Sequence, residues 1–203
     1  LHLATDKTIV WGSGLISDNC LPIKSPKEIL AVRGPLTRNK LLNAKIKCPE
    51  IFGDPALIMP SLFYPKIDKK YELGIIPHYV DKKHKFFLNK FNENVKIIDI
   101  EQENYQEFIS DVLSCKKIIS SSLHGLIISD AYDIPCLRAK FSDQIVGGDF
   151  KFNDYFLSVN RLIQKPIYID ETNLESILKS SFNYNKSINI SKLCKVNPFN
   201  LSL

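Results

Sequence analysis

The fold class of this chain follows from the segment KIISSSLHGLIISDAYDIP, residues 117–135. An apolar run enters three serines, and a second apolar segment begins directly after them at Leu123. The first run is typical of a buried strand, and the second is typical of a helix that packs on a sheet. Strands that turn directly into helices are the units of parallel α/β sheets. We therefore expect a strand, a helix and the start of a further strand here.

The sequence on both sides of this segment repeats the pattern. The expected elements are strands at 71–78, 95–100 and 134–141, a helix over 81–94 opened by Asp81, and a helix over 104–115 capped by Asn104. Together with the central segment they give the order β-α-β-α-β-α-β with short connections. This order predicts an α/β fold, a parallel sheet with helices on both faces.

Residues 1–65 contain the same ingredients in a less regular order. We expect a strand at 8–14, a strand and a helix that begins at a proline within 28–42, and a short strand followed by a turn within 51–60. This portion resembles the end of another α/β unit more than a complete one.

The sequence after residue 141 predicts a turn, two helices and a tail. The turn falls on Gly147 and Gly148 and leads into helical spacing, a second helix lies near 172–184, and the last residues are rich in Asn, Lys and Ser. The expected organisation is a partial α/β portion at 1–65, an α/β domain at 66–185 and a polar tail at 186–203.

The composition is that of a globular protein, because 44% apolar residues in a chain of 203 are enough for a packed core. The sequence has no run of about 18 apolar residues and no signal-peptide pattern, so we expect a cytoplasmic protein without a transmembrane segment. The chain begins with Leu1 and its one methionine is Met59, which predicts that an upstream segment is missing.

The charge and the cysteines argue against a nucleic-acid-binding protein and against a protein stabilised by disulfides. The net charge of +5 is spread over short lysine groups, which fit a solvated surface or a field that steers anions. No nucleic-acid recognition motif accompanies the charge, so we expect no nucleic-acid partner. The five cysteines are scattered and form no Cys-x-x-Cys pair, which indicates reduced thiols.

Polar residues follow three of the expected strands. His78 ends the first, Ser120 to His124 follow the third, and Lys140 to Asp143 follow the fourth. The carboxyl ends of parallel strands meet at one edge of a sheet, where open α/β proteins bind ligands. We therefore expect these residues to gather at one edge.

The serines admit two interpretations. Their hydroxyls can cap the following helix, or they can join its unpaired N–H groups to hold a phosphate or a carboxylate. Gly125, in the first turn, would let a ligand approach the backbone. His124 is either a general acid or base beside an anion pocket or a partly buried, hydrogen-bonded histidine.

Arg33 stands between an expected strand and the next helix. Its guanidinium could clamp a phosphate or a carboxylate with two hydrogen bonds, or it could form an ion pair with Asp54. The pattern favours neither.

Several other chemistries are not supported by the spacing of residues. The serines are not in a Gly-x-Ser-x-Gly elbow, the four histidines lack metal-ligand spacing, and no P-loop occurs. The GSG at 12–14 lacks the rest of a dinucleotide fingerprint and is interpreted as a tight turn.

At these residues the sequence resembles the polysaccharide pyruvyl transferase family. The matching pieces occur in the family's order: VWGSGLISD (10–18), AVRGPLTRNKLL (31–42), FGDPALIMP (52–60), GIIPHYVDKKH (74–84), IISSSLHGLIISDAYDIPCL (118–137) and GGDFKFNDYFLSVNR (147–161). The SLHG block followed by DFKFNDYFLSVNR is the most specific combination.

The resemblance implies two Rossmann-like domains that face each other as in GT-B glycosyltransferases. This chain would carry the C-terminal, donor-binding domain and the last part of the N-terminal one. The resemblance also implies an enzyme of exopolysaccharide biosynthesis that transfers pyruvate from phosphoenolpyruvate onto a sugar as a ketal. The lysine- and asparagine-rich composition is typical of an AT-rich bacterial genome. No metal or organic cofactor is expected. The expected acceptor is a glycan or a lipid-linked saccharide, which is compatible with peripheral membrane association.

The resemblance also implies roles for particular residues. The expected catalytic residues are His124 and Arg33, and the expected substrate-binding residues are Ser121, Ser122, Leu123, Gly125, His78, Lys140 and Lys151. Many relatives have an arginine where this chain has Ser122. Arg33, Arg138 or Lys140 could supply the missing guanidinium or ammonium charge.

Two other functions fit the same fold. The protein could be a glycosyltransferase that uses a nucleotide sugar, or a truncated, non-catalytic domain that binds glycan. Ser122 in place of arginine is the feature that favours the non-catalytic alternative.

Overall fold

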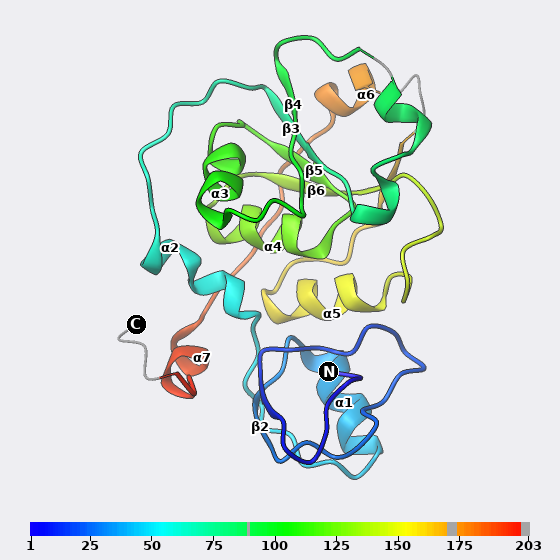
Figure 1. Ribbon diagram of the computed structural model, residues 1–203, viewed down its shortest axis with the longest axis vertical. Coiled ribbons are helices and arrows are strands. Elements are labelled where there is room, and N and C mark those ends of the chain that lie inside the picture. The colour runs from blue at the N-terminus through cyan, green and yellow to red at the C-terminus, as the bar shows by residue number, and fades with distance from the viewer. Residues whose placement is uncertain (89, 170–173, 200–203) are drawn as a thin grey trace. The chain divides into compact units, whose positions relative to one another are not determined.

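The computed structural model describes residues 1–88, 90–169 and 174–199 (Figure 1). The chain divides into two compact units, and each is described by itself. The five-stranded unit comprises Met59–Ile145 and Gln164–Asn183. The two-stranded unit comprises Leu1–Ile58, Val146–Ile163 and Tyr184–Leu203.

The five-stranded unit is built on a parallel sheet with the strand order β4-β3-β5-β6-β7. Its strands are β3 (Leu73–Ile76), β4 (Val95–Ile97), β5 (Ile118–Ser120), β6 (Cys136–Lys140) and β7 (Ile167–Tyr168). The four expected strands and their parallel pairing are confirmed. The fifth, β7, was not predicted, because two residues are too short to show a periodic pattern.

Both faces of this sheet are covered. Helices α3 (Tyr105–Leu113) and α4 (Leu123–Ala131) contact each other, and α4 packs on β5 and β6 (Figure 1). The opposite face carries a core in which Ile75, Ile119 and Leu137 meet Phe86 and Ile177. Those last two residues belong to the 3₁₀ helix η3 (Lys85–Leu88) and to α6 (Leu174–Lys179). The Rossmann-like α/β architecture is thereby confirmed.

The chain between β3 and β4 differs from the prediction. Two 3₁₀ helices, η2 (Tyr79–Asp81) and η3, replace the single helix expected over 81–94. A helix opened by Asp81 needs its carboxylate to accept N–H groups of the first turn. Instead, the carboxylate accepts the hydroxyls of Ser121 and Ser142, which come from other loops. The tertiary contacts therefore outweigh the local helical spacing.

The other predicted helix starts agree with the structure where it describes them. Asn104 caps α3, since its side-chain oxygen accepts the N–H groups of Gln106 and Glu107. The structure places α6 within the helix expected near 172–184, whose first residues lie outside the described ranges.

The two-stranded unit has a pair of parallel strands and several helices. Its elements are β1 (Ile9–Trp11), β2 (Glu28–Ala31), α1 (Pro35–Asn43), η1 (Pro55–Ile58), α5 (Phe150–Ser158) and α7 (Ser191–Lys195), while the short helix α2 (Met59–Leu62) starts the other unit. As expected, α1 begins at Pro35 after β2, and α5 follows the turn at Gly147 and Gly148. The strand expected within 51–60 is reduced to one bridge between Val32 and Phe52.

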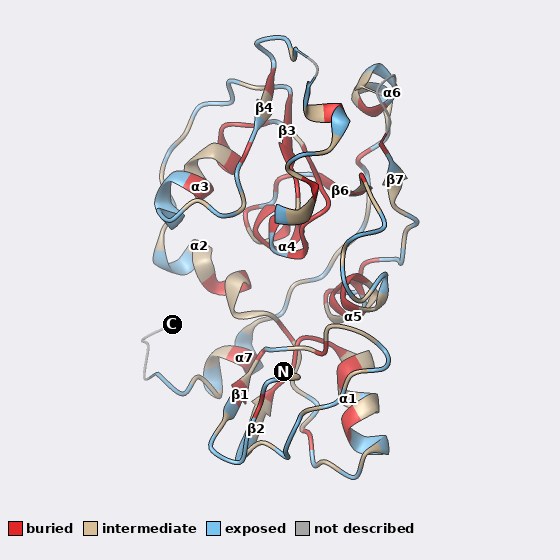
Figure 2. Cartoon of the chain, turned by 45° about the vertical axis from the view of Figure 1, so that its right-hand side comes forward, coloured by how far each residue is buried: buried red, intermediate tan, exposed pale blue. Residues whose placement is uncertain are grey.

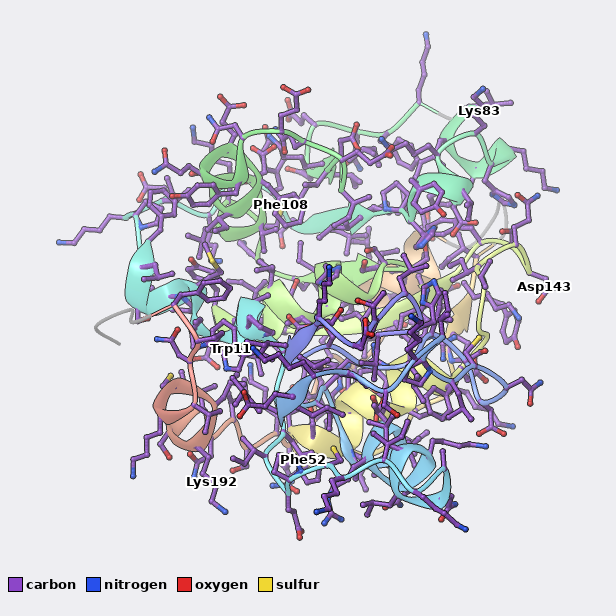
Figure 3. The ribbon with its side chains drawn as sticks, turned by 60° about the horizontal axis from the view of Figure 1, so that its bottom comes forward. Trp11, Phe52, Lys83, Phe108, Asp143 and Lys192 are labelled. Carbon is purple, nitrogen blue, oxygen red and sulfur yellow. The ribbon has the colours of Figure 1, made fainter. Side chains whose placement is uncertain are left out.

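Part of the expected tail is ordered. Within α7, Leu193 is fully buried, and its carbonyl accepts the indole N–H of Trp11 at 3.0 Å (Trp11 is labelled in Figure 3). The expected domain boundaries lie at residues 65 and 185, whereas the compact units divide the chain after residues 58, 145, 163 and 183. Residues 146–163 join the two-stranded unit because α5 packs on α1.

Candidate functional site

The sheet order creates a topological switch point between β3 and β5. Counted from β3, the strands lie in the order 2-1-3-4-5. The chain therefore leaves β3 toward one side of the sheet and leaves β5 toward the other. Open α/β proteins bind ligands outside the carboxyl ends of two such strands.

A chain of hydrogen bonds joins the loops at this edge. The backbone N–H of His78, after β3, donates to the hydroxyl oxygen of Ser121 at 2.8 Å. That hydroxyl donates to Asp81 at 2.7 Å, and the other carboxylate oxygen accepts the hydroxyl of Ser142 at 2.5 Å. The loops after β3, β5 and β6 thus meet as expected from the strand ends.

Two members of this cluster, Asp81 and Ser142, were missed by sequence reasoning. Asp81 was interpreted as a helix cap, and Ser142 lay unmarked within the stretch expected to follow β6. Asp81 is only 1% exposed. A carboxyl residue shortly after a buried strand end was the signal that could have identified it.

The three serines do not cap α4 with their side chains. Ser122 is the N-cap residue, and its hydroxyl makes no capping hydrogen bond. Ser120 is buried and lies 2.9 Å from the carbonyl oxygens of Ile76 and Ser122, while its oxygen accepts the Ser122 N–H at 3.0 Å. The serines thus fix the backbone that enters α4. The first helical turn then offers N–H groups without intrahelical partners, at Leu123, His124 and Gly125.

His124 differs from the rest of its helix. Among the nine residues of α4 it alone is exposed, whereas seven are buried and Ala131 is intermediate. Figure 2 shows α4 as a predominantly buried helix. The structure therefore does not show the partly buried histidine of the alternative interpretation. It places an imidazole within reach of solutes at the start of a helix, at the switch point of the sheet.

Gly125 serves helix packing. A Cβ atom at this position would lie 2.3 Å from the hydroxyl oxygen of Ser120 and 3.1 Å from Cγ2 of Ile76. The absent side chain lets α4 approach β3 and β5 closely. Close approach of the helix to the sheet, rather than of a ligand to the backbone, is what this structure shows for Gly125.

We expect Gly125→Ala to lower the free energy of unfolding by about 1–3 kcal/mol, the usual cost of overpacking a core. Alanine is about 1 kcal/mol more favourable than glycine in a helix. Without a clash, the substitution would therefore raise the free energy of unfolding, so the sign of the measured change tests the clash. Urea denaturation measures it. The double variant Ser120→Ala/Gly125→Ala should lose less than the two single variants added together, because it removes the clashing oxygen. A stability equal to or above that of the unmodified chain in Gly125→Ala would contradict the packing role.

Lys140 ends β6 and lies beside two groups. Its ammonium forms an ion pair with Asp143, and it sits 5.2 Å from the ring centroid of Tyr168. Asp143 is exposed at the edge of the unit (labelled in Figure 3). An anionic ligand at Lys140 would have to compete with this carboxylate.

Arg33 belongs to the two-stranded unit and is held there by a buried carboxylate. Its Nε lies 3.1 Å and its Nη2 3.0 Å from Asp154, and Nη2 also donates to the carbonyl of Leu15 at 2.7 Å. Burial lowers the pKa of Arg33, whereas the charges of Asp154 and Asp54 oppose that effect. Arg33 therefore forms a buried ion pair with Asp154, and the charge of Asp54 acts on the same guanidinium.

Lys151 also lies in the two-stranded unit. It is a buried residue of α5, with its ammonium 5.5 Å from the ring centroid of Phe152. The other candidates, His78, Ser121 to Gly125 and Lys140, belong to the five-stranded unit. Within that unit, one hydrogen bond connects the backbone N–H of His78 to the hydroxyl oxygen of Ser121.

The described residues contain neither a metal-binding group nor a membrane-spanning helix. Within residues 1–88, 90–169 and 174–199, no three His, Cys, Asp or Glu side chains are grouped so that they could hold a metal ion. Over the same residues, none of the helices combines the length and the hydropathy needed to cross a membrane.

Comparison with known proteins decides the family. The sequence model of the polysaccharide pyruvyl transferase family matches residues 2–138. The chain belongs to the polysaccharide pyruvyl transferase family. The match includes the switch point from His78 to Gly125 and ends at Arg138, before Lys140 and Lys151.

Two curated relatives of this pyruvyl transferase family member are similar over most of its length. Uncharacterized protein L143 of Acanthamoeba polyphaga mimivirus is 34% identical over an alignment of 161 residues that covers 73% of this chain and 53% of the relative. The succinoglycan biosynthesis protein ExoV of Rhizobium meliloti is 29% identical over an alignment of 166 residues that covers 76% of this chain and 48% of ExoV. The chain thus spans about half the length of the curated relatives it matches. No solved structure matches it significantly.

Proposed function

We propose that this chain carries the donor-binding part of an enzyme that transfers pyruvate from phosphoenolpyruvate to a sugar. The exposed imidazole of His124 in the first turn of α4, at the switch point of the sheet, carries this proposal. Membership of the pyruvyl transferase family supports it.

The donor is an anion with a phosphate and a carboxylate. The first turn of α4 can meet one of these groups with its N–H donors and with the positive end of the helix dipole. His78 follows β3 and Lys140 ends β6, the two strands on either side of β5, and these residues are the candidates for the second group. Ser122 stands where many relatives have an arginine. As the N-cap residue of α4, it lies directly before these N–H donors.

His124 is proposed as the general acid that starts the reaction. It donates a proton to the methylene carbon of phosphoenolpyruvate, and the adjacent enol carbon becomes electrophilic. A sugar hydroxyl adds to that carbon and returns a proton to the imidazole. The bond between this carbon and the phosphate oxygen then breaks, and a second hydroxyl adds to give the ketal. Its proton leaves with the inorganic phosphate or to solvent, so protons balance over the cycle.

The acceptor is proposed to be a sugar of a cell-surface polysaccharide, as free glycan or lipid-linked saccharide. The name of the relative ExoV, a succinoglycan biosynthesis protein, supports this class of acceptor. A GT-B arrangement, a cytoplasmic location, a bacterial source and peripheral membrane association stay predictions.

The test measures inorganic phosphate released from phosphoenolpyruvate with and without a panel of glycans. We expect release that depends on both substrates. With ¹⁸O in the bridging position of the donor, the label should appear in the phosphate, because the carbon–oxygen bond breaks. A contaminating phosphatase that cleaves the phosphorus–oxygen bond would leave the label in pyruvate.

Thermal stabilisation tests donor choice without turnover. A donor at 100 times its dissociation constant should stabilise the protein by about 2.7 kcal/mol. Stabilisation by a UDP- or GDP-sugar and none by phosphoenolpyruvate would overturn the proposal in favour of a glycosyltransferase. Glycan binding with neither phosphate release nor donor binding would overturn it in favour of a non-catalytic domain.

A further inference from the structure

Asp81 places a buried carboxyl group at the edge of the five-stranded unit. Its side chain is 1% exposed. In the described part of the chain, both partners of its carboxylate are neutral hydroxyls, of Ser121 and Ser142. Buried carboxylates are expensive unless they are well hydrogen-bonded. The two hydroxyl groups therefore stabilise a carboxyl group that would be costly to bury alone, which indicates that Asp81 has a specific role at this position.

The two hydroxyls come from different loops. Ser121 follows β5 and Ser142 follows β6, while Asp81 itself lies in the connection after β3. One carboxylate thus joins three loops that emerge from neighbouring strands. Because each oxygen of Asp81 accepts a hydroxyl from a different strand end, the contact fixes how these loops are spaced.

Ser121 passes this constraint to the start of α4. Its hydroxyl donates to Asp81 and accepts the backbone N–H of His78, and its own N–H donates to Ile76 at 3.2 Å. The hydroxyl proton of Ser121 is therefore already engaged. In this structure Ser121 acts through its position, one residue before the N-cap of α4.

His78 is fixed by the same cluster. Its backbone is held by Ser121, its Nδ1 accepts the Val80 N–H at 3.4 Å, and its ring lies on Tyr79 with centroids 4.3 Å apart. A neutral imidazole that accepts at Nδ1 carries its proton on Nε2. The Asp81 cluster thus orients the backbone of both histidine-bearing loops.

We propose that Asp81 is a positioning residue, which sets the first turn of α4 and His78 for the anionic donor through Ser121. This inference rests on the proposed function of that site. The carboxylate does not touch the donor; its role is to hold Ser121 and Ser142 at a fixed separation. The geometry of its two acceptor oxygens, more than its charge, carries this role.

The test compares Asp81→Asn with Asp81→Ala. The amide oxygen of asparagine can accept the Ser121 hydroxyl, and its NH₂ group can donate to Ser142, so both links survive without the charge. Alanine removes both links. Asp68→Asn, an exposed change in the same unit, is the matched control.

Hydrogen exchange reads the position of the loop independently of activity. In Asp81→Ala we expect exchange of the hydrogen-bonded amides of Ser121, Ser122 and Leu126 to rise by about tenfold, while α3 exchanges as before. Asp81→Asn should restore protection. Unchanged exchange at α4 in Asp81→Ala would overturn the positioning role.

The KM for phosphoenolpyruvate distinguishes a positioning role from a general loss of stability, because a general loss of stability would not change KM alone. We expect the KM for phosphoenolpyruvate to rise by about tenfold in Asp81→Ala with a smaller change in kcat, and to recover in Asp81→Asn. An Asp81→Asn variant as impaired as Asp81→Ala, with normal exchange, would show that charge matters and would overturn the proposal. If exchange responds as expected but the unmodified chain releases no phosphate, the positional link stands and the proposed function fails.

Discussion

Asp154→Ala is expected to lower the free energy of unfolding by about 3–5 kcal/mol, the usual cost of removing one partner of a buried ion pair. The carboxylate is fully buried and serves two residues of the same unit. It binds the guanidinium of Arg33, and it accepts the N–H of Thr37 at 2.9 Å and its hydroxyl at 2.7 Å. Without it, a buried cation and two buried donors lose their acceptor.

The surrounding backbone leaves little room for repair. A Cβ atom at Gly34 would lie 1.9 Å from the carbonyl oxygen of Asp154, and one at Gly14 would lie 2.3 Å from Cζ of Arg33. The chain therefore closes tightly around the ion pair. This geometry favours the upper part of the expected range.

Urea denaturation of Asp154→Ala and Asp18→Ala provides the comparison. Asp18 forms an ion pair with Lys40 at 2.7 Å, in the same unit, but its side chain is 64% exposed. Exposed pairs contribute about 0–1 kcal/mol. Equal losses in the two variants would contradict the structural role given to the buried pair.

His124→Ala is expected to reduce phosphate release from phosphoenolpyruvate by about 10²–10⁴-fold, the range for loss of a general acid or base. The reason is chemical, because the exposed ring contributes little to packing. The folding free energy should change by no more than about 0.5 kcal/mol. Loss of rate with retained stability would separate a role in catalysis from a role in folding.

Steady-state phosphate release and urea denaturation of the same preparations measure both quantities. His2→Ala, in the two-stranded unit, is the control for removal of an imidazole elsewhere. Retention of more than about a tenth of the normal rate in His124→Ala would be too small a loss for the proposed general acid.

Elements whose residues are set by local sequence could be predicted. The apolar runs of β3 and β5 and the Asn104 cap of α3 are specified by neighbours within one or two turns. The edge at which the polar loops gather follows from parallel pairing alone. Hence the place of His124 and Ser121 was predictable.

Features set by distant partners could not be predicted. Arg33 pairs with a carboxylate 121 residues away. Asp81 does not cap a helix, because its carboxyl group accepts hydroxyls from residues 40 and 61 positions further along the chain. Helix α7 is held by a hydrogen bond from the indole N–H of Trp11 to the carbonyl oxygen of Leu193. In each case tertiary contacts override a locally reasonable interpretation.

Binding of phosphoenolpyruvate at the start of α4 can be observed by NMR in a titration of the ¹⁵N-labelled chain. We expect the amide signals of Leu123, His124 and Gly125 to shift in a saturable manner, together with the ring signals of His124. We also expect a weaker response to inorganic phosphate or pyruvate alone, since each supplies only part of the donor. Saturable shifts elsewhere in the chain while these signals stay in place would contradict binding at the start of α4.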